Sequence, residues 1–183
     1  MSRKADTRDR FETIAVKHLD AAYSLARWLL RDGVLAEDVV QDAMLRALTY
    51  FDSFRGENPR AWLLQIVRNV ALGKLNARRT APLSLDDEHG PSSGEWSRSV
   101  ADQNEEPESA LQRAQEHVRA RQLLETLPAE LRECLILREL EECSYKEIAQ
   151  IIDAPIGTVM SRLWRARQWL AKASADEEKC SER

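Results

Sequence analysis

The segment at residues 144–170 constrains the fold more than any other part of the chain. Ser144 and Glu147 have the spacing of a capping box, which predicts that a helix begins just after Ser144. Pro155 disfavours helical backbone in the residue before it and therefore ends this short helix. A second helical pattern starts near Gly157. Two short helices separated by a break of about four residues are typical of a helix-turn-helix.

The second helix of this pair has the chemistry of a DNA-binding helix. Residues 160–172 contain four basic residues and no acidic residue, in a chain of net charge -4. In a helix-turn-helix the second helix enters the major groove, where arginines bind phosphates or guanine edges and hydroxyls bind phosphates or bases. The alternative is the solvated face of an ordinary helix pair, but the local positive charge favours DNA binding. The candidate contact residues are Thr158, Ser161, Arg162 and Arg165.

We expect the whole chain to be all-α. It has only six glycines and no convincing run of alternating β-branched residues. Gly33 is expected to cap the end of the first helix, and Gly73 should weaken the third helix by about 1 kcal/mol. Helical spacing of apolar residues predicts helices at 8–31, 36–51, 59–79, 108–125 and 128–142, followed by the helix-turn-helix up to residue 174.

Charge divides the chain into three parts. Residues 1–80 hold 14 basic and 10 acidic residues, whereas residues 81–117 hold 2 basic and 9 acidic residues. Residues 118–183 are nearly balanced, with 11 basic and 12 acidic residues. The pattern indicates two helical parts joined by an acidic connection.

The domain boundaries follow from composition. Residues 81–107 are rich in Ser, Asp, Glu, Gly and Pro, and such a composition buries too little apolar surface to fold alone. We therefore expect two small helical domains, at 8–80 and 108–174, joined by a flexible acidic linker at 81–107. Trp96 in this linker could be a docking anchor or could fold back onto either domain.

The helix predicted at 59–79 is a candidate for binding single-stranded nucleic acid. Arg60, Arg68 and Asn69 are among its polar residues, none of which is acidic, and Phe54 lies in the preceding loop. A basic helix beside an exposed aromatic ring neutralises phosphates and offers a stacking surface for a base. The spacing is equally consistent with Phe54 packing on the core and with basic residues that only make the helix soluble.

Several classes of protein are excluded by what the sequence lacks. No stretch has the apolar length of a membrane span, and the charged N-terminal residues lack the apolar core of a signal peptide. The three cysteines and three histidines match no common metal-binding spacing, and no coherent catalytic constellation appears. We expect a cytoplasmic protein with no membrane insertion, no metal, no cofactor and no enzyme activity.

Four segments together resemble the extracytoplasmic-function (ECF) sigma factors, small promoter-recognition subunits of bacterial RNA polymerase. They are AEDVVQDAMLRAL at 36–48, FDSFRG at 51–56, NPRAWLLQIVRNVAL at 58–72 and LPAELRECLILRELEECSYKEIAQIIDAPIGTVMSRLWRAR at 127–167. The resemblance spans nearly the whole chain apart from the linker and the tail. It implies a factor that joins core RNA polymerase, directs it to two-part promoters and starts transcription. The alternative is a sigma-like decoy that binds an anti-sigma factor without initiating transcription.

The resemblance also implies partners. Asp38, Gln41 and Asp42 match the surface that family members place on the polymerase, so core RNA polymerase is the expected protein partner. Many family members are held inactive by an anti-sigma factor, which would be a further partner. Promoter DNA is the expected nucleic-acid partner, in both duplex and single-stranded form.

The DNA-facing residues implied by the resemblance fall into two groups. Met160 departs from the pattern, because many relatives have a basic residue at its position. The minus-ten element, read and melted as single strands, would be contacted by Phe54, Arg60, Arg68 and Asn69. The minus-thirty-five element, read as duplex, would be contacted by Thr158, Ser161, Arg162 and Arg165.

Overall fold

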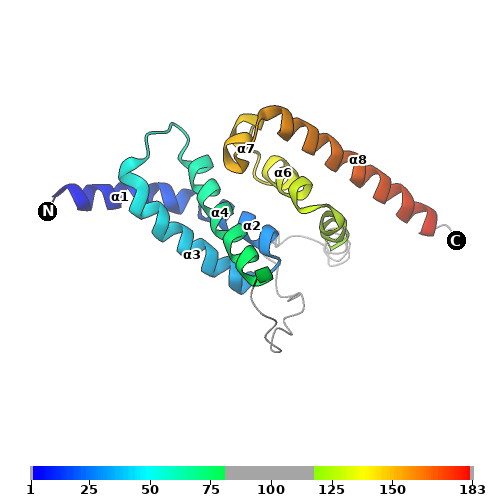
Figure 1. Ribbon diagram of the computed structural model, residues 1–183, viewed down its shortest axis with the longest axis horizontal. Helices are drawn as coiled ribbons and strands as arrows, with labels where there is room; N and C mark the ends of the chain where they lie inside the picture. The colour runs from blue at the N-terminus through cyan, green and yellow to red at the C-terminus, as the bar shows by residue number, and fades with distance from the viewer. Residues whose placement is uncertain (1, 81–117, 182–183) are drawn as a thin grey trace, which may run out of the picture.

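The computed structural model describes the backbone of residues 2–80 and 118–181, in which helices are joined by short loops and no strand occurs (Figure 1). This confirms the all-α prediction for these residues. The predicted linker, Trp96 and the start of the helix predicted at 108–125 lie outside the described residues. None of the described helices is long and apolar enough to cross a membrane.

The helices form two lobes. The first lobe contains α1 (Ser2–Lys17), α2 (Leu19–Leu30), α3 (Gly33–Tyr50), a short 3-10 turn at Phe51–Ser53, and α4 (Pro59–Thr80). The second lobe contains a helical segment at 118–126, α6 (Ala129–Glu139), α7 (Tyr145–Ile152) and α8 (Ile156–Ser181). Helix α8 therefore continues beyond the end predicted at residue 174.

The start of the chain differs from its prediction in two ways. The single helix predicted at 8–31 is divided at His18 into α1 and α2. Gly33 does not cap the end of α2, because Arg31 itself takes the left-handed conformation there, with φ of 59°. Asp32 then caps α3 by accepting a backbone N–H at 3.1 Å. Aspartate is a stronger N-cap than glycine, so Gly33 becomes the first residue of α3.

The helix-turn-helix forms as its sequence predicts. The Ser144 hydroxyl accepts the Glu147 backbone N–H at 3.3 Å, and the Glu147 carboxylate accepts the Ser144 N–H at 2.7 Å. Asp153 ends α7 in the left-handed conformation, with φ of 52°, and α8 starts three residues later. The apolar side chains that fix α7 against α8 are Ile148, Ile151, Ile152, Val159, Leu163 and Ala166.

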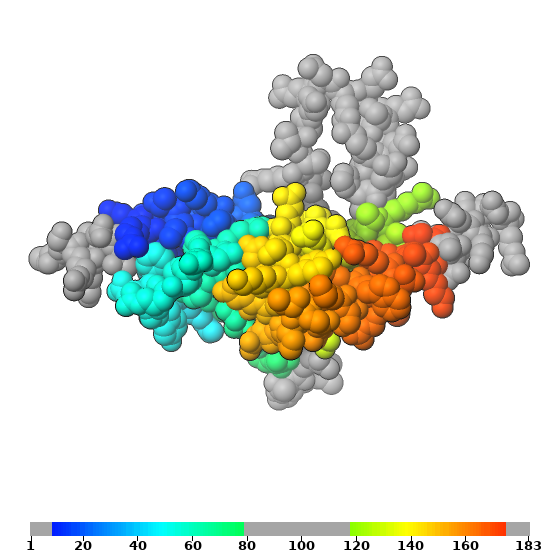
Figure 2. Space-filling view, turned by 90° about the horizontal axis from the view of Figure 1, so that it is seen from above, coloured from blue at the N-terminus to red at the C-terminus, as the bar shows by residue number. Residues whose placement is uncertain are grey.

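The two lobes pack directly against each other, which the sequence did not predict (Figure 2). Helices α2 and α4 of the first lobe contact α6 and α7 of the second. Leu25, Ala61 and Leu64 of the first lobe are at most 1% exposed and share one apolar cluster with side chains of the second lobe. The other face of α2 and α4 packs on α3, so both helices are apolar on two sides.

Candidate nucleic-acid interface

The outer face of α4 carries three of the predicted minus-ten contacts, but only one of them is fully exposed. Asn69 points to solvent, whereas the Arg60 and Arg68 side chains are 27% and 17% exposed. Arg68 donates from Nε to Glu133 Oε1 at 2.5 Å and from Nη2 to Oε2 at 3.3 Å. Arg60 donates from Nη2 to Glu141 Oε2 at 3.0 Å. The second lobe therefore covers the arginines that the sequence predicted to be exterior.

Both acidic partners are buried. The side chains of Glu133 and Glu141 are 5% and 8% exposed, respectively. A buried carboxylate loses its hydration and is tolerated only when it is paired and hydrogen-bonded. Arg68 and Arg60 supply these pairs, so the same guanidinium groups are not available to a phosphate in this arrangement.

Phe54 lies in the loop before α4 and stacks on Trp62, with ring centroids 4.7 Å apart and an interplanar angle of 31°. Its ring crosses Gly56 so closely that a Cβ atom at that position would lie 2.7 Å from a ring carbon. Phe54 is half-buried, so the ring both packs on a neighbour and keeps an accessible part. A substitution at Gly56 would therefore move the ring.

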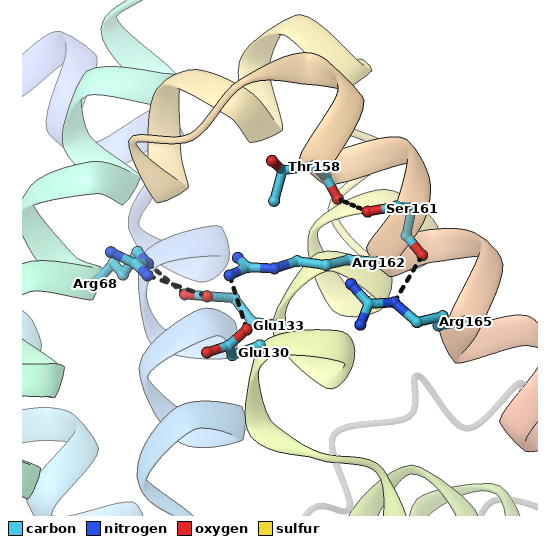
Figure 3. A network of polar contacts seen from close by, with 7 residues as sticks. All are labelled: Arg68, Glu130, Glu133, Thr158, Ser161, Arg162 and Arg165. Atoms are coloured by element: carbon cyan, nitrogen blue, oxygen red, sulfur yellow. Dashed lines mark hydrogen bonds and ion pairs between the residues drawn. The ribbon is translucent and has the colours of Figure 1, made fainter.

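Helix α8 exposes two of its four predicted contacts, as Figure 3 shows. Ser161 and Arg165 face outward, with the Ser161 hydroxyl donating to the Thr158 carbonyl at 2.9 Å and Arg165 Nε donating to the Ser161 carbonyl at 3.3 Å. Thr158 is half-buried. Arg162 turns toward α6, where its Nη2 donates to Glu130 Oε2 at 2.8 Å (Figure 3).

Two large apolar residues on the outer face of α8 have no assigned role from the sequence. Met160 is 53% exposed and Trp164 is 64% exposed. Helical spacing could have predicted this apolar patch, because Trp164 lies one helical turn after Met160 and next to Arg165 in the sequence. The face that would approach DNA is therefore apolar as well as basic.

The predicted polymerase-binding residues lie on the outer side of α3. Asp38 and Gln41 are exposed, whereas Asp42 is half-buried and pairs with Lys74 at 3.2 Å. Val34 and Leu45 are 75% and 59% exposed and fall at helical spacing with Asp38 and Gln41. The sequence analysis did not assign these two apolar residues. Together they give the surface an apolar component that suits a protein partner.

No group of His, Cys, Asp and Glu able to hold a metal ion occurs within the residues that the structure describes. Cys134 and Cys143 are buried, and burial raises the pKa of each thiol to about 11. At neutral pH both are protonated core residues rather than ligands or nucleophiles.

Known families match both lobes. The Sigma-70 region 2 family matches residues 14–80, and the Sigma-70 region 4 family matches residues 117–170. The RNA polymerase sigma-H factor of Pseudomonas aeruginosa is 33% identical over 165 residues, covering 89% of this chain and 85% of the relative. The ECF RNA polymerase sigma-E factor of Escherichia coli is 34% identical over 159 residues, covering 86% of this chain and 83% of the relative.

Solved structures share the fold. The sigma factor RpoE of Bartonella quintana, crystallised with the anti-sigma factor NepR, has a TM-score of 0.64 and 27% identity, over 89% of this chain and 95% of that one. CnrH, solved with the cytosolic domain of CnrY, has a TM-score of 0.62 at 22% identity, over 94% of this chain and 95% of that one. The two lobes, their helix-turn-helix and these relatives lead to one conclusion: the chain belongs to the ECF family of RNA polymerase sigma factors.

Proposed function

We propose that this sigma factor divides promoter recognition between its two lobes, with domain boundaries at 8–80 and 108–174. Residues of α4 and the loop before it would read and melt the minus-ten element as single strands. Residues of α8 would read the minus-thirty-five element in the major groove. The protein would act in the cytoplasm as a binding factor and not as an enzyme.

The observation that carries this proposal is the charge of the two helices. Neither α4 nor the part of α8 up to residue 174 contains an acidic residue, although the chain as a whole is acidic. Asn69 on α4, and Ser161 and Arg165 on α8, are exposed and able to reach bases or phosphates. Because the DNA-facing part of α8 offers only a few cationic groups, the second lobe would bind DNA weakly alone. Holding both lobes on one polymerase would raise their effective concentration at paired sites.

The partly covered side chains keep their proposed roles once the lobes are free to contact DNA. Arg60 and Arg68 would neutralise phosphates of the melted strand, and Phe54 would stack on an unpaired base with Trp62 as its support. Arg162 and Thr158 would contact the minus-thirty-five element from the inner side of α8.

Discrimination between base reading and phosphate binding is testable at Arg165. If Arg165 reads a base, Arg165→Ala should weaken binding to the cognate minus-thirty-five duplex by roughly 1–3 kcal/mol and relax the preference at one base pair. Fluorescence anisotropy on a set of single-base duplex variants measures this preference. An equal loss on every duplex would make Arg165 a phosphate contact instead.

Core polymerase binding is proposed to use the outer side of α3. Asp38→Ala and Gln41→Ala should weaken capture by immobilised core RNA polymerase, because both side chains are exposed on one stripe with Val34 and Leu45. Glu37→Ala removes an exposed carboxylate beside this stripe and is the matched control. Normal capture of the Asp38→Ala and Gln41→Ala variants would move the polymerase site elsewhere.

An anti-sigma factor is the further partner that we propose. The related Bartonella quintana RpoE was crystallised with the anti-sigma factor NepR, and this chain exposes large apolar side chains on both lobes. Val34 and Leu45 of α3 and Trp164 of α8 are among these side chains, at 75%, 59% and 64% exposed, respectively. Co-expression with candidate antagonists and size-exclusion chromatography test this partner, and Trp164→Ala should weaken such a complex.

A further inference from the structure

Two rows of exposed side chains run side by side along the start of α8. The buried side of this helix is formed by Val159, Leu163 and Ala166, which are at most 1% exposed. Away from it, Ile156, Met160 and Trp164 follow one another at intervals of four residues and are 45%, 53% and 64% exposed. Residues four apart are neighbours on a helix, so these three form an apolar row. Ser161 and Arg165 form the polar row beside it (Figure 3).

The positive charge of α8 is partly neutralised within the second lobe. Residues 160–172 contain four basic side chains, and two of them pair with carboxylates of α6. Arg162 donates to Glu130 at 2.8 Å. Arg167 donates to Glu139 at 3.0 Å. Charge alone therefore gives this helix a limited hold on DNA, and contacts with the bases gain weight in its choice of sequence.

Met160 lies in the part of α8 that is expected to approach the bases. It is the fifth residue of the helix, which begins at Ile156. In a helix-turn-helix, the N-terminal residues of the second helix contact base edges in the major groove. Ser161, the next residue, is a candidate contact on the same grounds. The exposed Met160 side chain is thus expected to meet a base edge.

The chemistry of methionine selects one group on those edges. Unmodified DNA presents a single apolar group in the major groove, the C5-methyl of thymine. The thioether of Met160 is at most a weak hydrogen-bond acceptor, so it reads the polar groups of the other bases poorly. Its unbranched side chain adapts its shape to the surface that it contacts. Trp164, with its Cβ atom about 5–6 Å from that of Met160, offers a second apolar wall for the same methyl group.

We propose that Met160 is a specificity-determining residue that reads a thymine C5-methyl group in the minus-thirty-five element. This inference rests on the minus-thirty-five role of α8 proposed above. The methyl group leaves water against Met160, while Ser161 and Arg165 bind polar base edges or phosphates nearby. Burial of one such group corresponds to about fourfold in affinity, a factor equal to ~0.8 kcal/mol.

Replacement of thymine by uracil isolates the methyl group. The full chain is assembled with core RNA polymerase, and bound promoter fragments are selected from a library randomised in the minus-thirty-five region. Each thymine of the selected element is then replaced singly by uracil, which removes the methyl group and keeps the O4 acceptor. Fluorescence anisotropy of labelled promoter duplexes measures binding. The wild-type holoenzyme should lose about fourfold in affinity at one uracil position.

Variants at Met160 assign the methyl contact to this residue. Met160→Gln keeps the length of the side chain but makes it polar, and should bind the thymine and uracil duplexes equally at that position. Val118→Gln is the matched control, because Val118 is an apolar residue of the same lobe that is 55% exposed and lies outside α8. It should keep the wild-type difference. Melting curves verify that both variants fold.

Met160→Arg tests the same position with the opposite chemistry. A guanidinium there should remove the preference for thymine over uracil. If it reaches one phosphate, the slope of log affinity against log salt concentration should also steepen by about 0.9. A Met160→Arg variant that keeps the thymine preference would contradict the methyl contact.

The outcomes separate the methyl contact from the function on which it rests. Selection of no minus-thirty-five motif would overturn the duplex-reading role of α8. A selected motif with equal binding of all thymine and uracil duplexes by the wild type would overturn the methyl contact alone. A difference that persists in Met160→Gln would assign the methyl group to another residue. Weaker capture of core polymerase by Met160→Gln, with an equal loss on every duplex, would make the apolar row a protein-binding surface and overturn the proposal.

Discussion

Arg68 Nε lies 2.5 Å from Glu133 Oε1, and this pair ties α4 of the first lobe to α6 of the second. The two residues are 65 positions apart in the sequence, on opposite sides of the acidic segment. Because the Glu133 side chain is only 5% exposed, its charge depends on Arg68 for compensation.

Removal of Arg68 should therefore cost stability. Arg68→Ala leaves the Glu133 carboxylate buried without its partner, and we expect the free energy of unfolding to fall by about 3 kcal/mol. Urea denaturation measures this change. Lys74→Ala is the matched control, because Lys74 lies on the same helix as Arg68 and pairs with Asp42 of α3. Both side chains of that pair are 43% exposed, so it should contribute less than about 1 kcal/mol. Equal small losses in both variants would show that the pair with Glu133 is not formed in solution.

Leu63 and Leu64 are adjacent, equally buried and face different neighbours. Leu64 packs on the second lobe, whereas Leu63 packs on Phe11 and Phe51 of the first. Each change to alanine should cost roughly 2–5 kcal/mol through the cavity it leaves. Only Leu64→Ala should increase the distance between spin labels attached at Thr49→Cys on α3 and Lys146→Cys on α7, measured by double electron–electron resonance. A longer distance in Leu63→Ala as well would place the interface elsewhere on α4.

The capping box of α7 makes stability depend on pH. Hydrogen bonds from the Ser144 side chain, then from the Ser144 backbone, hold the pKa of Glu147 below its usual value of 4.5. The lowered pKa in the folded state means that the ionised carboxylate stabilises the protein above pH 4.5. This contribution is lost as the pH falls through the folded-state pKa. Glu147→Gln should be less stable than wild type at pH 7, and the difference should shrink below pH 4.5 in denaturation curves. A constant difference across this window would contradict the assignment.

Gly73 lowers the stability of α4 relative to an alanine at the same position. It lies inside α4, and a Cβ atom built there meets nothing within 4 Å. Gly73→Ala should therefore raise the free energy of unfolding by about 1 kcal/mol, because alanine restricts the unfolded chain and favours helix. Thermal and urea denaturation measure the change. A destabilised variant would show that α4 needs the glycine for a contact that forms outside this arrangement.

The helix-turn-helix was predictable because its signals are local. The capping box of Ser144 and Glu147, the break before Pro155 and the tolerance of Asp153 for left-handed backbone each act within a few residues. The end of α2 at Arg31 was not predictable in the same way. Gly33 suits the end of one helix and Asp32 suits the start of the next, and local sequence does not decide which of the two preferences is satisfied.

The contact between the lobes is non-local, and only an indirect sign of it is present in the sequence. In α2, Ala22 and Ala26 face the first lobe while Leu25 faces the second, so one wide apolar stripe serves two interfaces. In α4, Leu64 packs in the cluster with the second lobe, and the sequence analysis assigned this side chain no contact. Periodicity reports that a side chain is apolar, but it does not identify the element that covers it. The pairing of Arg60 and Arg68 with buried carboxylates was missed for the same reason.

Run-off transcription with sigma-free core RNA polymerase and a library of genomic fragments tests the central claim most directly. The wild-type chain and the Arg10→Ala control, which changes an exposed arginine of α1, should produce new transcripts whose start sites share a two-part upstream motif. Asn69→Ala and Arg165→Ala should lose these transcripts while still binding core polymerase. Binding to core without any transcript from the wild type would indicate a decoy. No binding to core polymerase would contradict the account as a whole.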